Sequence, residues 1–172
     1  ETDDTGARIM GHFSKELVSE NNLACIMILP PYQRRGYGKL LIQISYDLSY
    51  REGWVGTPEK PLSDLGKVSY RSYWWWRILD VLEKTGAEDV TLSQLSRDAG
   101  ILPDDILSTL QSGNYRGWRA TGDVICRSVQ RLIEHCNEIG KARAPRLILD
   151  SSKIRWTPRK KRDSPIYTAF ED

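Results

Sequence analysis

The apolar positions in the first third of the chain predict two strands followed by a helix. Residues 8–13 and 23–29 are short apolar runs, and the polar, turn-rich stretch 19–22 between them favours a hairpin. Two prolines at residues 30 and 31 end the second run. Apolar residues then recur between residues 38 and 50 at the spacing of a helix with one buried face, at Leu40, Leu41, Ile44 and Leu48.

A long loop and a second helix follow. Residues 53–66 contain three glycines and two prolines, which is too broken for regular structure. Residues 67–84 then place their large apolar side chains on or near one helical face, at Tyr70, Trp74, Ile78, Val81 and Leu82. We expect this helix to pack on the sheet, and we expect the run of three tryptophans at residues 74–76 to be core or interface packing.

The remaining elements suggest a winged-helix-like order. A helix over residues 93–99 ends at Gly100, and a second over residues 103–112 has Pro103 in its first turn and Gly113 after it. Residues 118–126 predict a hairpin that turns at residues 121–123, and residues 129–139 predict a third helix. We therefore divide the chain into an α/β unit at residues 1–83 and a mainly helical, winged-helix-like lobe at residues 84–172.

Composition narrows the class of protein. With 172 residues, of which 40% are hydrophobic and 28% charged, the chain has the makeup of an ordinary globular protein of one domain or two lobes. Its longest apolar run, residues 23–29, is far short of the ~20 residues that span a bilayer, so we expect no membrane segment. Three cysteines without a C-x-x-C pair and two distant histidines, His12 and His135, predict no metal site and a reducing setting. The missing initial methionine suggests a fragment of a longer protein.

Basic charge is local. The net charge is +2, but residues 141–162 carry nine Lys or Arg and one acid, Asp150. This stretch and the winged-helix-like order raise the alternative of a nucleic-acid-binding module. However, the helix that would read the bases begins with Asp104 and Asp105 and contains no Lys or Arg, which is the wrong charge for phosphates. Direct nucleic-acid binding is therefore disfavoured.

A glycine-rich loop between the second strand and the first helix has the chemistry of an anion site. Backbone N–H groups there and the positive end of the helix can converge on an anion, and two glycines allow close approach of the backbone. Three cations suit a pyrophosphate better than a single carboxylate. A tight turn with solvated arginines remains the alternative on this pattern alone. The loop comprises Gln33, Arg34, Arg35, Gly36, Tyr37, Gly38 and Lys39.

Gln-x-x-Gly-x-Gly between a strand and a helix resembles the coenzyme A signature of the N-acetyltransferase fold. The wider stretches 22–39, 57–66 and 69–74 resemble the core of the MYST lysine acetyltransferases, with the MOF branch as the nearest likeness. The likeness is dense over residues 5–82, and residues 105–112 and 154–158 look like further family landmarks. It implies an N-acetyltransferase-like core that uses acetyl-CoA as co-substrate. By the same resemblance, contacts to acetyl-CoA would come from the loop, which would hold the pyrophosphate, and from Ile26, Met27, Ile28, Ser63 and Ser72.

The resemblance also implies a catalytic pair, Glu59 and Cys25. Acetyl transfer to a lysine ammonium with a pKa near ~10.4 needs a positioned base. By itself, Glu59 in its proline-flanked turn predicts a solvated surface charge, and Cys25 in its apolar strand predicts a small buried hydrophobe. MYST enzymes carry their catalytic glutamate and a cysteine at these positions. We favour direct attack by lysine with a partly buried Glu59 as base over an acetyl-cysteine intermediate.

The implied function is histone lysine acetylation in the nucleus, with histone tails as substrates and chromatin-complex subunits as partners. Two features depart from the family: the upstream zinc-finger region is not in this chain, and residues 115–123 differ from relatives, so no cofactor contact is carried over there. The alternative of a weakly active or inactive scaffold is opposed by retention of Glu59 and the whole glycine-rich loop. Residues 159–162 are either a nuclear-import signal or a solvated basic tail.

Overall fold

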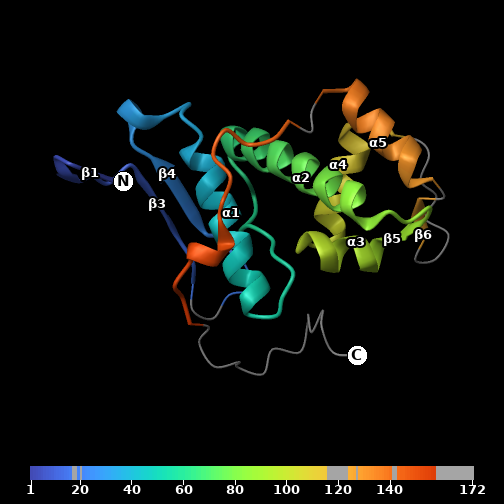
Figure 1. The fold of residues 1–172 in the computed structure, drawn as a ribbon, viewed down its shortest axis with the longest axis horizontal. Coiled ribbons are helices and arrows are strands. Elements are labelled where there is room, and N and C mark those ends of the chain that lie inside the picture. Colours follow the sequence, from blue (N-terminus) through green and yellow to red (C-terminus); the bar gives the residue numbers. More distant parts are fainter. Residues whose placement is uncertain (17–18, 20, 116–123, 127, 141–142, 158–172) are drawn as a thin grey trace.

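The computed structural model describes residues 1–16, 19, 21–115, 124–126, 128–140 and 143–157. Its helices and strands follow the chain from blue to orange in Figure 1. The elements are β1 (Thr2–Asp3), β2 (Gly6–Ala7), β3 (Gly11–Ser14), β4 (Cys25–Ile28), η1 (Pro30–Tyr32), α1 (Tyr37–Arg51), α2 (Asp64–Thr85), β5 (Val90–Thr91), α3 (Leu92–Ala99), α4 (Pro103–Ser112), β6 (Val124–Cys126), α5 (Val129–Glu138) and η2 (Ser151–Lys153).

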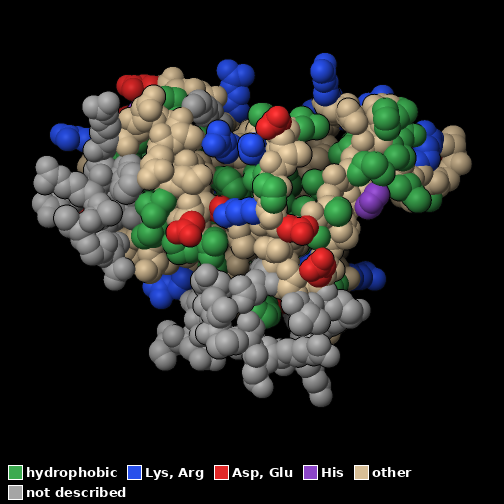
Figure 2. All heavy atoms as spheres, turned by 180° about the vertical axis from the view of Figure 1, so that it is seen from behind, with side chains coloured by type: hydrophobic (Ala, Val, Ile, Leu, Met, Phe, Trp, Pro, Cys, Tyr) green, Lys and Arg blue, Asp and Glu red, His purple; other side chains and the backbone are tan. Residues whose placement is uncertain are grey.

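The predicted hairpin is present, with shorter strands than the apolar runs. β3 pairs antiparallel with β4, and Gly11 lies opposite Ile28. A side chain at Gly11 would place its Cβ 2.5 Å from the Met27 carbonyl oxygen, so glycine is required for the close approach of the two strands. Hydrophobic side chains gather at this end of the molecule (Figure 2), and among them Ile9 and Met27 are exposed.

The helix predicted over residues 38–50 is confirmed as α1, but its most deeply buried face is not the predicted one. Leu40 and Leu41 face the hairpin side and are half-buried, and with Ile28 they line a cavity of about 510 Å³. Tyr46 instead faces α2 and is 4% exposed. The difference arises because α1 lies between the hairpin and α2 and buries residues on two sides, at Ile42, Gln43, Ser45, Tyr46 and Ser49.

The second predicted helix is confirmed as α2, the central helix of the molecule. It starts at Asp64, three residues before the predicted start at Lys67, because the Ser63 hydroxyl accepts a hydrogen bond from the Gly66 N–H (3.1 Å) and caps the helix. The expectation that α2 packs on the sheet was wrong. It packs mainly against α1, α3, α4 and α5, and α1 separates it from β3 and β4 (Figure 1).

Aromatic side chains fill the interface between α1 and α2. Tyr46 and Tyr70 meet edge to face with ring centroids 6.5 Å apart, and the Trp74 indole N–H donates to the Tyr46 hydroxyl (2.7 Å). Trp75 is 1% exposed and fills the space beside Gly113, where a Cβ would lie 2.5 Å from its ring. The run of tryptophans therefore serves core packing, as predicted.

The helices predicted in the second half are confirmed as α3, α4 and α5. Thr91 caps α3, whose end lies at Gly100 with φ of 70°. Pro103 starts α4, and Ser128 caps α5. Of the hairpin predicted over residues 118–126, residues 118–123 lie outside the described part. β6 pairs antiparallel with β5, so its partner lies more than thirty residues earlier in the chain.

The last described stretch returns to α1. The Gln43 amide donates to the Leu147 carbonyl (2.9 Å) and accepts from the Leu149 N–H (3.0 Å), and Arg51 donates to the Ser151 carbonyl (2.6 Å). These bonds satisfy the buried Gln43 side chain, which would otherwise lose hydration without compensation. Residues 147–151 thus cover the outer side of α1 (Figure 1).

Candidate active site

The glycine-rich loop connects η1 to α1 and takes a conformation suited to an anion. Arg34 has φ of 61° and Gly36 has φ of 99°, so two left-handed residues flank Arg35. Alternation of this kind turns successive N–H groups toward the same side. The first N–H groups of α1, which begins at Tyr37, have no acceptor within the helix and add its positive end.

Neighbouring residues hold the loop in place. The Gln33 amide donates to the Ile28 carbonyl (3.1 Å), which ties the loop to the end of β4. A Cβ at Gly36 would lie 3.2 Å from the Leu147 side chain, so the returning segment packs directly on the loop. The side chains of Arg34 and Arg35 are exposed, and the Arg35 guanidinium lies 5.7 Å from the centre of the Tyr32 ring. Both cations are therefore free to meet a ligand from solvent.

Packing of α1 on α2 joins two of the predicted site residues. The Lys39 ammonium donates to the Ser72 hydroxyl (2.6 Å). Both residues line a cavity of about 420 Å³ that also includes Arg71 and Arg143. Partial burial lowers the pKa of the Lys39 ammonium, and an anion in the cavity would offset that cost.

The sequence reasoning did not assign Arg71 or Arg143 to a site. Arg71 is the immediate neighbour of Ser72, and Arg143 belongs to the basic stretch 141–162, so both signals were available in the sequence. No acidic residue lines this cavity within the described part of the chain. Three cations around one cavity make it suited to phosphate groups.

Ser63, which was also predicted to contact the cofactor, caps α2 in the structure. Its hydroxyl caps α2 by accepting the Gly66 N–H, and its side chain is exposed at the start of that helix. Within the described part of the chain, its side chain makes no hydrogen bond to the glycine-rich loop, although Ser63 is close in sequence to Glu59. The structure thus brings Lys39 and Ser72 together but does not join Ser63 to them.

The predicted catalytic residues lie at the same end of β4. The Glu59 N–H donates to the Leu23 carbonyl (2.9 Å), and the Asn22 N–H donates to the Thr57 carbonyl (2.9 Å). The Glu59 backbone is therefore fixed beside the segment that leads into Cys25, the first residue of β4. Glu59 and Cys25 thus lie on neighbouring segments, although they are far apart in the sequence.

Both predicted catalytic side chains are accessible. Glu59 is exposed, and the expectation of partial burial was wrong, because the loop leaves the interior after the buried Pro58 and is exposed over residues 59–61. Cys25 is also exposed, contrary to the expectation of a buried hydrophobe drawn from its apolar strand. In β4 burial alternates, so Cys25 and Met27 share the open face, while Ile26 and Ile28 lie on the half-buried face. An incoming substrate can reach both the thiol and the carboxylate.

The two histidines lie on different elements: His12 pairs with Met27 across the β3–β4 hairpin, and His135 lies in α5. His12 is exposed on β3, and the His135 ring lies 2.9 Å from the Gly113 carbonyl oxygen. Over the described ranges, no group of three His, Cys, Asp or Glu side chains has the arrangement of a metal site. Among the helices that the structure describes, none has the length and apolar character needed to cross a bilayer.

Comparisons with known proteins place the chain among acetyltransferases. The sequence model of the MOZ/SAS family matches residues 1–154. Histone acetyltransferase MOF of Drosophila melanogaster is 45% identical over 161 residues, which cover 92% of this chain and 19% of that protein. Histone acetyltransferase of the MYST family 1 of Arabidopsis thaliana is 50% identical over 162 residues, which cover 93% of this chain and 36% of that protein. Human histone acetyltransferase KAT6A is 42% identical over 160 residues, which cover 92% of this chain and 8% of that protein. The chain thus spans little more than a third of these relatives at most.

Proposed function

Because the chain belongs to the MOZ/SAS (MYST) family, we propose that it is the acetyl-CoA-binding and catalytic part of a histone lysine acetyltransferase. The family expected from the motifs is confirmed by the match over residues 1–154, and membership implies an acetyltransferase-like fold. Histones are proposed as substrates because the relatives are named histone acetyltransferases. The observation that carries the proposal is the glycine-rich loop, with its cationic cavity, at one end of β4, while Glu59 lies beside the residues that lead into the other end.

We propose that acetyl-CoA binds along β4. The pyrophosphate would meet the loop residues 33–39, and the separate phosphate on the ribose of CoA would meet the cavity of Lys39, Ser72, Arg71 and Arg143. The acetyl and pantetheine portions would lie along Ile26, Met27 and Ile28, and Ser63 would contact a further part. This assignment is supported by the positive end of α1 and by the absence of acids from the described cavity wall.

In the proposed reaction Glu59 removes a proton from the lysine ammonium of the histone tail. The neutral amine then attacks the thioester carbonyl, a C–N bond forms and the C–S bond breaks. The nitrogen loses a second proton to become the amide, and the departing thiolate takes up one proton to leave as CoA. Backbone N–H groups near residues 26–28 are the proposed donors to the oxyanion. Exposure of Glu59 supports this role, since the base must reach a lysine that arrives from solvent.

The test compares labelled acetyl transfer from acetyl-CoA to a core-histone tail peptide by three forms of the chain. We expect Glu59→Gln to lower turnover at neutral pH by about 10²-fold or more, as removal of a general base does. Cys25→Ala should retain most activity. The reverse ranking would favour an acetyl-cysteine intermediate, and inactivity of all forms, including the unaltered chain, would favour the scaffold alternative.

We further propose that residues 84–172 form a winged-helix-like lobe beside the core of residues 1–83. The helix order α3, α4 and α5 and the β5–β6 pair support this description, and residues 147–151 return from this lobe to α1. The lobe would act as a wall of the histone groove. The acidic start of α4, at Asp104 and Asp105, continues to argue against the nucleic-acid-binding alternative.

A nuclear location and assembly with chromatin-complex subunits are part of the same proposal. They rest on the names of the relatives, since a histone acetyltransferase meets its substrate in chromatin. The possible import signal at residues 159–162 lies outside the described residues. Acetyl-CoA is proposed as the co-substrate.

A further inference from the structure

One buried acid on the second lobe contacts both flanks of Glu59. Asp105 lies in the first turn of α4 and is 2% exposed. One carboxylate oxygen accepts a hydrogen bond from the Thr57 hydroxyl (2.7 Å), and the other accepts from the Lys60 ammonium (2.7 Å). A single side chain therefore holds the residues on either side of Pro58 and Glu59.

A buried carboxylate is costly unless it is paired and hydrogen-bonded. The surroundings of Asp105 are those of a core, since Ile106 and Leu110 of the same helix are fully buried. An apolar residue at this position would avoid the cost of burying a charge. The positive start of α4 and the two bonds from the loop offset that cost. The acid thus suits this position because of the loop that it holds.

The loop is also fixed through its backbone. Before Glu59, the Gly56 N–H donates to the Gly100 carbonyl (2.7 Å), and the Leu102 N–H donates back to the Gly56 carbonyl (3.1 Å). On the other side, the Glu59 N–H bonds to Leu23 of the core. The loop therefore joins both lobes, and the Asp105 carboxylate adds the side-chain contacts that connect its Glu59 end to α4.

We propose that Asp105 is a positioning residue, which holds the Thr57–Lys60 turn so that the Glu59 carboxylate is placed to accept the lysine proton. This inference rests on the proposed function, since it requires Glu59 to be the base. It assigns the second lobe a direct part in the chemistry, in addition to its proposed place beside the histone groove. Asp105 itself touches neither substrate in this mechanism.

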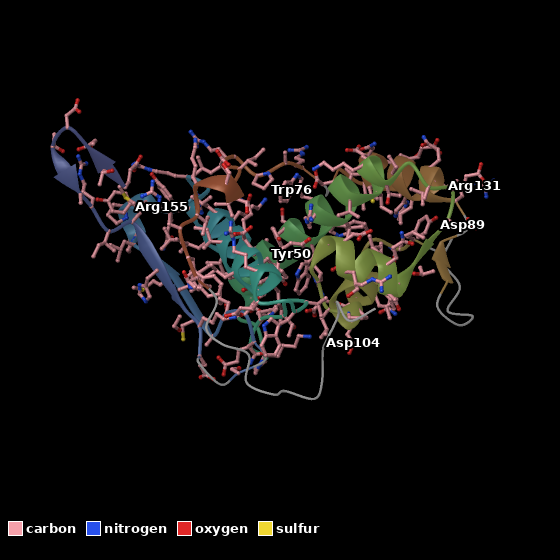
Figure 3. All side chains as sticks on the ribbon, turned by 60° about the horizontal axis from the view of Figure 1, so that its bottom comes forward. Tyr50, Trp76, Asp89, Asp104, Arg131 and Arg155 are labelled. Atoms are coloured by element: carbon pink, nitrogen blue, oxygen red, sulfur yellow. The ribbon has the colours of Figure 1, made fainter. Side chains whose placement is uncertain are left out.

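Asp105→Asn keeps the shape of the side chain and an oxygen for Thr57, but removes the charge that holds Lys60. We expect kcat to fall about tenfold, because small displacements of a base cost rate, with both KM values within about twofold. The matched control is Asp104→Asn, which makes the same charge change one residue earlier. Asp104 is exposed at the start of α4 (Figure 3), and its variant should stay within about twofold of the unaltered chain.

Variants on the loop test the same contact without altering α4. Thr57→Val removes the hydroxyl at nearly constant volume, and we expect kcat to fall about threefold to tenfold. Thr57→Ser retains a hydroxyl and should recover most of that loss. A Thr57→Val variant as active as the unaltered chain, with Asp105→Asn also fully active, would overturn the inference.

A double-mutant cycle separates positioning from a general structural role. If Asp105 acts through Glu59, Asp105→Asn should cause no further loss of kcat in a Glu59→Gln background. The same tenfold loss in both backgrounds would overturn the positioning role while leaving Glu59 as the base. Full activity of Glu59→Gln would instead show that Glu59 is not the base, and the positioning role of Asp105 would be rejected with it.

Discussion

The same substitution at two neighbouring tyrosines should change stability in opposite directions. Tyr70 is 1% exposed, and its hydroxyl has no hydrogen-bond partner among the described residues. Tyr46 is 4% exposed, and its hydroxyl accepts the Trp74 indole N–H. We predict that Tyr70→Phe stabilises the fold and that Tyr46→Phe destabilises it, although the two rings are in contact.

The magnitudes follow from the state of each hydroxyl. Removing the unpaired hydroxyl of Tyr70 recovers part of a desolvation cost of about 1–3 kcal/mol, so the free energy of unfolding should rise by about 1 kcal/mol. Tyr46→Phe leaves the buried Trp74 N–H without an acceptor and should cost about 1–3 kcal/mol. At about 2–4 °C per kcal/mol for a chain of this size, the two variants should differ in Tm by on the order of 10 °C.

Urea unfolding followed by circular dichroism measures both free energies, and calorimetry measures both Tm values. Because both variants remove one oxygen from the same aromatic interface, each serves as the control for the other. A Tyr70→Phe variant that is destabilised by more than about 1 kcal/mol would refute the reasoning, because its hydroxyl would then have a partner. Equal effects of the two substitutions would also refute it.

Two further predictions concern charge. Lys39→Met should weaken CoA binding about tenfold in titration calorimetry, because it removes a charge-assisted donor from the cationic cavity. The control, Lys84→Met, lies at the exposed far end of α2 and should leave CoA binding unchanged. Equal effects of the two variants would contradict the proposed phosphate site. The free energy of unfolding should be maintained up to about pH 10 and fall above it. Burial raises the pKa of Tyr46, Tyr70 and Tyr73 above the ordinary tyrosine value. Above about pH 10 the folded chain therefore retains protons that the unfolded chain releases, which favours unfolding. Tyr70→Phe should make this alkaline fall in the free energy of unfolding less steep, as measured by urea unfolding at several pH values. An unchanged fall would contradict the assignment of part of it to Tyr70.

Local signals were sufficient to predict most of the helices. The start of α4 at Pro103 and the end of α3 at Gly100 depend on the conformational preferences of single residues, and the sequence displays those directly. The buried face of α1 was not predictable in the same way. Whether Tyr46 or Leu40 is more deeply buried depends on which elements pack on each side of the helix, and that information is not contained in the periodicity.

The candidate site was predictable as a set of motifs but not as an arrangement. The loop at residues 33–39 was found from its composition, and Glu59 and Cys25 from a resemblance. The contact between Lys39 and Ser72 depends on how α1 crosses α2, and Arg143 reaches the same cavity from the far end of the chain. The sequence shows Asp105 only as one of two acids at the start of the predicted helix over residues 103–112. Its partners Thr57 and Lys60 lie more than forty residues earlier, so its burial was not visible locally.

A base that serves a flexible histone tail has two conflicting requirements: it must be open to solvent to receive the lysine, and it must be fixed to act on it. On the proposed function, the exposed side chain of Glu59 meets the first requirement, and its backbone, which bonds to Leu23, meets the second. Rigid anchoring on one lobe alone would leave the other side of the loop free. Because Gly56 and Asp105 also tie the loop to α4 and to the residues just before it, the position of Glu59 depends on how α4 is held beside the segment of Leu23. On the proposed function, a partner that shifts α4 against the core would change turnover without touching either substrate.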